Sequence, residues 1–295
     1  LAEICRATYG GRKPGFGLAS ALRSLGLPCS LPADIRAAAL DPAAAAQALD
    51  DGYRRKQSRR RYLCPLDLAD DLPPLAFGTA RIAEFEPHEL ADLFEAERLA
   101  RHFPKRRLDW RRLAKFRWLV VEEVVELEQE PEVRSTPFLY MVDREFGAIE
   151  VHRNRFPDAV EEILFFLMLA PWETWARYSD LDWRGFRIPW LHSVDDDLFV
   201  SPAAPPRTDT LTLEPWIVQD RWGEEHEDER PSVLPLRDDA YEELRRFDAA
   251  AWAEFDAARR TELFDGPVAH FLVRAFLAEG IDEFMAHMMV IEAGL

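Results

Sequence analysis

The longest uninterrupted apolar run in this chain covers eight residues, 163–170, and ends at Pro171. A helix that crosses a bilayer needs about twenty such residues. We therefore expect the run to be a core element, with no membrane as partner. The chain has 295 residues, and 48 % of them are hydrophobic, which suffices for sizeable cores in about two domains.

Charge is divided unevenly along the chain. Residues 1–117 carry a net charge of +6, whereas residues 118–295 carry a net charge of −23. Summed charge of this size affects long-range attraction to partners but does not determine the fold. We therefore expect the two parts to meet different partners, or each other.

The three cysteines, Cys5, Cys29 and Cys64, include no CxxC pair. This spacing predicts neither a disulfide framework nor a zinc site. No signal-peptide pattern follows Leu1, so a cytoplasmic protein is expected. We also expect no metal and no cofactor. The abrupt apolar end at Leu295 is interpreted, like the start at Leu1, as an end within a longer chain.

Helical and strand patterns are mixed, which predicts an α+β fold with a small antiparallel sheet, followed by a C-terminal helical bundle. Asp41 and Pro42 are typical of a helix start. Predicted helices cover 37–49, 87–103, 109–115, 157–170, 239–264, 267–280 and the residues from 282 onward, and predicted strands cover 116–127, 137–142, 146–151 and 211–216.

Three regions follow from this pattern. Residues 1–76 are expected to be helical or irregular, and their basic, proline-containing part near 51–76 is interpreted as a linker. Residues 77–230 are expected to form an α+β domain. Residues 231–295 are expected to form a helical domain that is incomplete.

Two clusters of basic residues are the candidate nucleic-acid contacts, because guanidinium groups bind phosphates and release counterions. Nearby aromatic side chains such as Tyr62 and Trp110 can stack on bases. The alternative is that the basic residues pair with the protein's own acids, notably Glu122 and Glu123. The candidates are Arg54, Arg55, Lys56, Arg59, Arg60, Arg61, Arg106, Arg107, Arg111 and Arg112.

Other motifs are weaker. The glycines at 15–17 lack the preceding strand and following Gly-Lys-Ser/Thr of a phosphate loop. The acids at 195–197 are interpreted as a solvated turn in preference to a cation site, and the segment around His226 as a charged loop. No HExxH motif or GxSxG elbow occurs. A hydrolase that uses Trp190, His192 and Asp195 is kept as a third possibility.

The segment 271–295 resembles the opening helices of the HEPN superfamily, in particular its Apea-like branch. The matching residues are Asp282, Phe284, Met285, Ile291, Glu292, Ala293 and Leu295. The resemblance implies an all-α bundle, frequent dimerisation through the C-terminal helices and metal-independent RNA cleavage in defence or toxin systems. The family's catalytic Arg and His lie on a later helix, so it assigns no catalytic residue here.

Two hypotheses of different classes follow. The first is a bacterial HEPN-like protein that binds or cleaves RNA. The second is a non-enzymatic interaction or scaffold protein whose acidic C-terminal part pairs with a basic partner or with its own N-terminal part. Whether the basic clusters are exposed or paired with the protein's own acids discriminates between the two.

Overall fold

The computed structural model describes fourteen stretches of the chain, and all structural statements below refer to them. They are residues 1–10, 15–27, 29–31, 41–66, 74–127, 129, 157–169, 190–206, 208, 211, 213–219, 222–231, 249–259 and 280–294.

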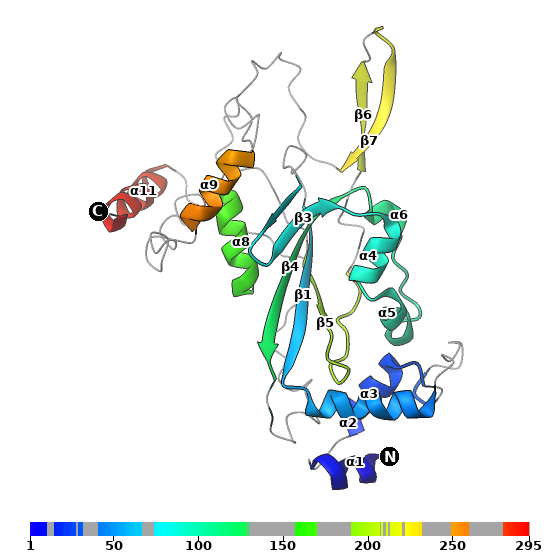
Figure 1. Cartoon of the computed structure of the whole chain (residues 1–295). Helices are drawn as coiled ribbons and strands as arrows, with labels where there is room; N and C mark the ends of the chain where they lie inside the picture. Colours follow the sequence, from blue (N-terminus) through cyan, green and yellow to red (C-terminus); the bar gives the residue numbers. More distant parts are fainter. Residues whose placement is uncertain are drawn as a thin grey trace.

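An antiparallel sheet of five strands, in the order β2-β3-β4-β1-β5, forms the centre of the structure (Figure 1). The long central pair, β1 with β4, runs in register from Gln57 opposite Glu126 to Leu66 opposite Arg117. The strands are β1 (Gln57–Leu66), β2 (Leu75–Phe77), β3 (Ala80–Glu84), β4 (Arg117–Glu126) and β5 (His192–Asp195).

Helices cover both faces of this sheet (Figure 1). On one side, called the α8 face here, Cys64, Ile82 and Leu119 pack against Phe166 of α8 (Asp158–Leu169) and Trp252 of α9 (Ala249–Arg259). Successive residues of a strand point to opposite faces of a sheet, so alternate residues share a face.

The opposite face, called the α4 face, contains Leu63 and Trp118, which pack with Leu90 and Phe94. This core is rich in aromatic residues, and the rings of Phe94 and Trp118 meet edge to face. The face is covered by α4 (Pro87–Leu93), α5 (Ala96–His102) and α6 (Trp110–Leu113).

The N-terminal helices have a core of their own, which is built around Phe199. They are α1 (Ala2–Tyr9), α2 (Gly15–Ser24) and α3 (Pro42–Arg54). Leu18 and Leu49 pack with Phe199, which belongs to the loop after β5. A Cβ atom on Gly52 would lie 2.8 Å from Cε2 of Phe199, so only glycine fits this approach.

Several predicted elements are confirmed. The Asp41 side chain caps α3 by accepting from the Ala43 backbone N–H, and that helix continues to Arg54. The short helix after Asp109, the strand at 116–127 and the helix at 157–170 appear as α6, β4 and α8. The predicted strand at 211–216 overlaps β6 (Leu213–Gln219) from Leu213 to Trp216. The α+β class with a small antiparallel sheet is therefore confirmed.

Three expectations are wrong. The expected linker contains strand β1 at the centre of the sheet, because its alternate residues Tyr62 and Cys64 are buried on the α8 face. The single helix after Pro87 is two helices, which are divided at Glu95 by a left-handed backbone (φ 52°). The expected loop around His226 is strand β7 (Glu225–Pro231), which pairs with β6.

The C-terminal bundle stays a prediction. The described parts of this region are α9 and α11 (Ile281–Gly294). The predicted hairpin at 137–151 lies outside the described residues. The same holds for residues 267–279 of the predicted helix at 267–280. The limits of the three expected domains stay predictions as well. Among the described residues, no helix has the length and apolar character needed to span a membrane.

Candidate functional site

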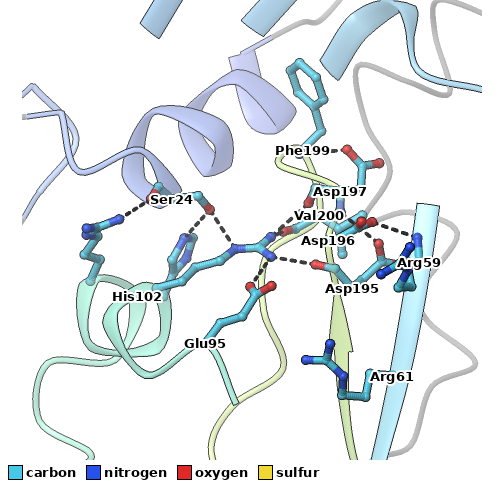
Figure 2. Close-up of polar contacts among 12 residues, drawn as sticks. Ser24, Arg59, Arg61, Glu95, His102, Asp195, Asp196, Asp197, Phe199 and Val200 are labelled. Atoms are coloured by element: carbon cyan, nitrogen blue, oxygen red, sulfur yellow. Dashed lines mark hydrogen bonds and ion pairs between the residues drawn. The ribbon is translucent and has the colours of Figure 1, made fainter. Parts of the chain in front are cut away.

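A polar junction joins α2, α5 and the turn that follows β5 (Figure 2). Its centre is Arg98 on α5, with 8 % of its surface exposed. Its other members are Ser24, Glu95, His102, Asp195, Asp197 and Val200. We call this set the Arg98 junction.

The Arg98 guanidinium makes five hydrogen bonds. Nε–H donates to Oγ of Ser24 at 3.0 Å, and Nη1 donates to Oε2 of Glu95 at 2.9 Å and to the Asp195 carbonyl. Nη2 donates to the carbonyl oxygens of Asp197, at 2.9 Å, and Val200, at 2.6 Å. Five N–H groups are all that a guanidinium has. Arg98 therefore has no donor left for a ligand and fixes the turn to α5.

The acids at 195–197 form a turn that is held by hydrogen bonds. The expectation of a solvated turn is therefore wrong. Oδ1 of Asp195 accepts from the Asp197 N–H at 3.0 Å, and Oδ1 of Asp197 accepts from the Phe199 N–H at 3.1 Å. Asp195 is 6 % exposed and Asp197 is fully buried. Asp196 accepts from the backbone N–H of Arg59, at 2.7 Å, and from the Arg55 side chain. These carboxylates satisfy backbone donors.

Ser24 connects Arg98 with His102, one turn further along α5. The hydroxyl accepts from Arg98 and lies 3.0 Å from Nε2 of His102. Burial and the nearby cations Arg98, Arg23 and Arg101 lower the pKa of His102 to about 4. A neutral imidazole with its proton on Nδ1 accepts a hydrogen bond from the Ser24 hydroxyl at Nε2, which continues the chain of hydrogen bonds from Arg98.

A second polar cluster lies at the end of the α8 face. The Tyr62 hydroxyl donates to Oε1 of Glu123 at 2.6 Å, and Arg60 donates to the same oxygen at 3.2 Å. Arg60 also contacts Oδ2 of Asp195 at 3.3 Å. Burial and the bond to Glu123 raise the pKa of Tyr62 to about 12. Tyr62 therefore stays protonated, and the cluster is an ion-pair network joining β1, β4 and β5.

Most of the basic candidates at 54–61 are paired with the protein's own acids. Arg54 contacts Asp50, Arg55 contacts Asp196, and Arg61 donates to Glu122 at 2.9 Å and to the Leu93 carbonyl. The side chains of Lys56 and Arg59 are exposed, and no ion pair of theirs is found among the described residues.

Part of the second basic cluster is hydrogen-bonded to backbone carbonyl oxygens. Arg106 donates to the Pro205 carbonyl at 3.2 Å, and Arg112 donates to the Leu211 carbonyl. These bonds hold the segment after Val200 against α6. In contrast, Arg107 and Arg111 are exposed, and within the described stretches neither forms an ion pair.

The two basic clusters lie at opposite ends of the sheet. The residues at 54–61 lead into β1 at the Gln57–Glu126 end, whereas α6 precedes the opposite end, where Leu66 meets Arg117. Ten residues of strand span about 30 Å. Figure 1 shows α3 and α6 at these two ends. The clusters therefore form two separate surfaces.

The structure does not bring together the residues of the hydrolase hypothesis. His192 is paired with Leu63 and stacks on Phe94 on the α4 face, with ring centroids 4.9 Å apart. Asp195 lies three residues later in the chain, and its side chain accepts a hydrogen bond from Arg60 on the α8 face. His192 is 1 % exposed, and burial lowers its pKa to about 4. The ring is part of the core.

Sequence reasoning missed Arg98 and His102, which lie outside the basic runs. Their spacing of four residues on a helix places them on one side, and this was the available signal. Among the described residues, no group of three or more His, Cys, Asp or Glu side chains is arranged to hold a metal ion.

Comparisons of this chain with protein-family models, with curated proteins and with solved structures found no match.

Proposed function

We propose that this protein is a non-enzymatic interaction protein that binds its partner through helix α11. The observation that carries the proposal is the apolar surface of α11. Phe284 is 62 % exposed and Ile291 is 56 % exposed, although both are large apolar residues. Exposed apolar surface of this kind is typical of a protein interface.

The charged residues of the two polar clusters support this proposal, because they are hydrogen-bonded to one another and to the backbone. Arg98 uses all five donors inside the Arg98 junction. Glu123 and Asp195 both accept from Arg60. Such networks contribute conformational specificity to a fold. A catalytic group, in contrast, needs contact with a substrate.

The test is a pull-down with the full chain, followed by reconstitution with the purified partner. The double variant Phe284→Ser/Met288→Ser replaces two exposed apolar side chains of α11 without changing charge. A partner retained by the wild-type chain and lost with this variant, in the extract and after purification, supports the proposal. Val124→Ser is the matched control, because Val124 is 64 % exposed but lies on β4. Partners that are retained equally by the double variant contradict the proposal.

RNA binding is a second candidate function. It is favoured by the exposed side chains of Arg107, in the loop before α6, and of Arg111 on α6. The HEPN resemblance adds RNA cleavage in a defence or toxin setting. Arg98 and His102 lie one turn apart on α5, but both bond to Ser24 of α2, so we assign no cleavage step to them.

A filter-binding assay across a salt series tests the second candidate. Replacement of Arg107 and Arg111 by Gln is expected to weaken RNA binding and to lower its salt dependence, since two phosphate contacts are lost. Arg60 and Arg61 are unsuitable for this test because they pair with Glu123 and Glu122. RNA affinity that is absent, or unchanged in the double variant, removes this candidate.

A further inference from the structure

Helix α11 has an unusual pattern of exposure. Its small residue Ala286 is buried, at 8 % exposure, whereas its large apolar residues point outward. Ile281 is 77 % exposed and Phe284 is 62 % exposed. An amphipathic helix at the surface of a globular protein normally shows the opposite pattern. Apolar side chains of this size are stabilised when another surface covers them.

Five of the six exposed large apolar residues of α11 form one stripe along the helix, and the sixth, Met289, is 42 % exposed and lies next to it. Ile281, Phe284, Met288 and Ile291 follow one another at spacings of three, four and three residues, and Met285 lies beside them. This spacing places side chains on a single face and is the spacing at which a second helix packs. We call these five residues the α11 stripe. Its methionine side chains are flexible, so the stripe can adapt to the shape of a partner.

Charge beside the α11 stripe indicates which partner fits. Asp282 and Glu292 are exposed at its two ends, and α11 contains no Lys or Arg. The whole chain carries a net charge of −17. A second copy of this chain would place acids near acids, and an anionic membrane would be repelled in the same way. A partner with basic residues beside an apolar stripe has the complementary charge.

We infer that the α11 stripe is the docking site for a basic amphipathic helix of another protein. Apolar side chains of the partner cover the stripe, and Lys or Arg residues at its flanks meet Asp282 and Glu292. This inference rests on the proposed function and adds the chemistry of the partner. Recognition of one helix by another through an apolar stripe, with flanking charges that select the partner, is a common mode of association.

A fluorescein-labelled 18-residue peptide of Leu and Lys in an amphipathic helical pattern is the probe, and its anisotropy is titrated with the full chain. A peptide with Glu in place of Lys tests the charge requirement. We expect the Leu/Lys peptide to bind and the Leu/Glu peptide to bind at least about tenfold more weakly. Phe284→Ser/Met288→Ser is expected to weaken Leu/Lys binding at least about tenfold as well.

Matched variants separate the two parts of the inference. Asp282→Asn/Glu292→Gln is expected to weaken Leu/Lys binding by about threefold and to reduce its dependence on salt. Glu97→Gln removes an exposed charge on α5 and is expected to have no effect, as is Val124→Ser on β4. Circular dichroism and urea unfolding of each variant confirm that the fold is retained. Substitutions at exposed positions such as these change stability little.

Four outcomes overturn the inference. Leu/Lys binding that is unchanged in Phe284→Ser/Met288→Ser shows attraction by net charge alone. Equal binding of the Leu/Glu peptide contradicts the basic partner. Light scattering could find stripe-dependent dimers, or vesicle flotation stripe-dependent membrane binding, while the Leu/Lys peptide does not bind. Either result contradicts the basic helix as partner but not the proposed function. If no association depends on the stripe, both the inference and the proposed function fail.

Discussion

Arg60 lies directly opposite Glu123 in the β1–β4 pair, and its Nη1 is 3.2 Å from Oε1 of that carboxylate. The two residues are far apart in sequence, and Arg60 belongs to the basic run that resembles a nucleic-acid contact. Their pairing means that this part of the run stabilises the sheet. The Arg60 side chain is 14 % exposed, so this ion pair is more protected from solvent than a pair at the protein surface.

A double-mutant cycle measures this pair. Arg60→Gln and Glu123→Gln are each expected to destabilise the protein, and the coupling free energy between them is expected to be about 1–2 kcal/mol, because they share a partly buried network. Urea unfolding of the wild type, both single variants and the double variant gives this value. Additive effects of the two substitutions would show that the contact does not stabilise the fold.

Arg98→Lys is expected to destabilise the protein by about 2–4 kcal/mol. A lysine ammonium has three donors where the guanidinium has five, so buried carbonyl acceptors lose their partners. Urea unfolding checks this change. Arg111→Lys is the control, since Arg111 is exposed on α6, and its effect should be within about 0.5 kcal/mol of zero. Equal stability of the two variants would contradict the role given to Arg98.

Gly52→Ala is expected to destabilise the N-terminal helices by about 1–3 kcal/mol, because the added methyl group meets the Phe199 ring at 2.8 Å. Phe199→Leu in the same chain should recover part of the loss. Thermal unfolding of both variants measures the effect, with the exposed Asp51→Ala as the control on the same helix. A Gly52→Ala protein as stable as the wild type would contradict this packing.

Acid is expected to destabilise the protein in the window from pH 6.5 to about 4. His102 and His192 each have a pKa of about 4 in the folded state, below the ordinary value of 6.5. The unfolded chain therefore takes up these protons first as the pH falls, and stability present above pH 6.5 is lost toward pH 4. Urea midpoints measured across this range give the slope.

Substitution identifies the groups responsible. His102→Gln keeps a hydrogen-bond acceptor for Ser24 and is expected to remove part of the slope, and His192→Phe is expected to remove a further part. His88→Gln, at an exposed position of α4, should leave the slope unchanged. A slope that is the same in all three variants would contradict the assignment.

Local signals predicted part of the fold correctly. The Asp41 cap and the Pro at position 42 gave the start of α3, and the apolar run closed by Pro171 gave α8. Strand β1 was missed because the stability of its basic residues comes from acids on β4 and β5, more than sixty residues away in the sequence. Only the register of the sheet shows these partners.

The candidate site was less predictable than the fold. Asp195 and Asp197 read as a solvated turn because three consecutive acids are usually exposed, whereas the buried Arg98 on a distant helix binds this turn. The exposure pattern of α11 was also not foreseen. In the sequence its apolar residues suggest a bundle core, and only the structure shows that Phe284 is exposed whereas Ala286 is buried.

The central claim is that the α11 stripe is an open apolar surface in the native protein. Oxidation of Met285 and Met288 by hydrogen peroxide, followed by mass spectrometry of the full chain, tests it most directly, because exposed methionines form sulfoxides readily. The account predicts rates within about threefold of those in the urea-unfolded chain, since these side chains are 49 % and 38 % exposed. Oxidation that is tens of times slower in the native protein would contradict it.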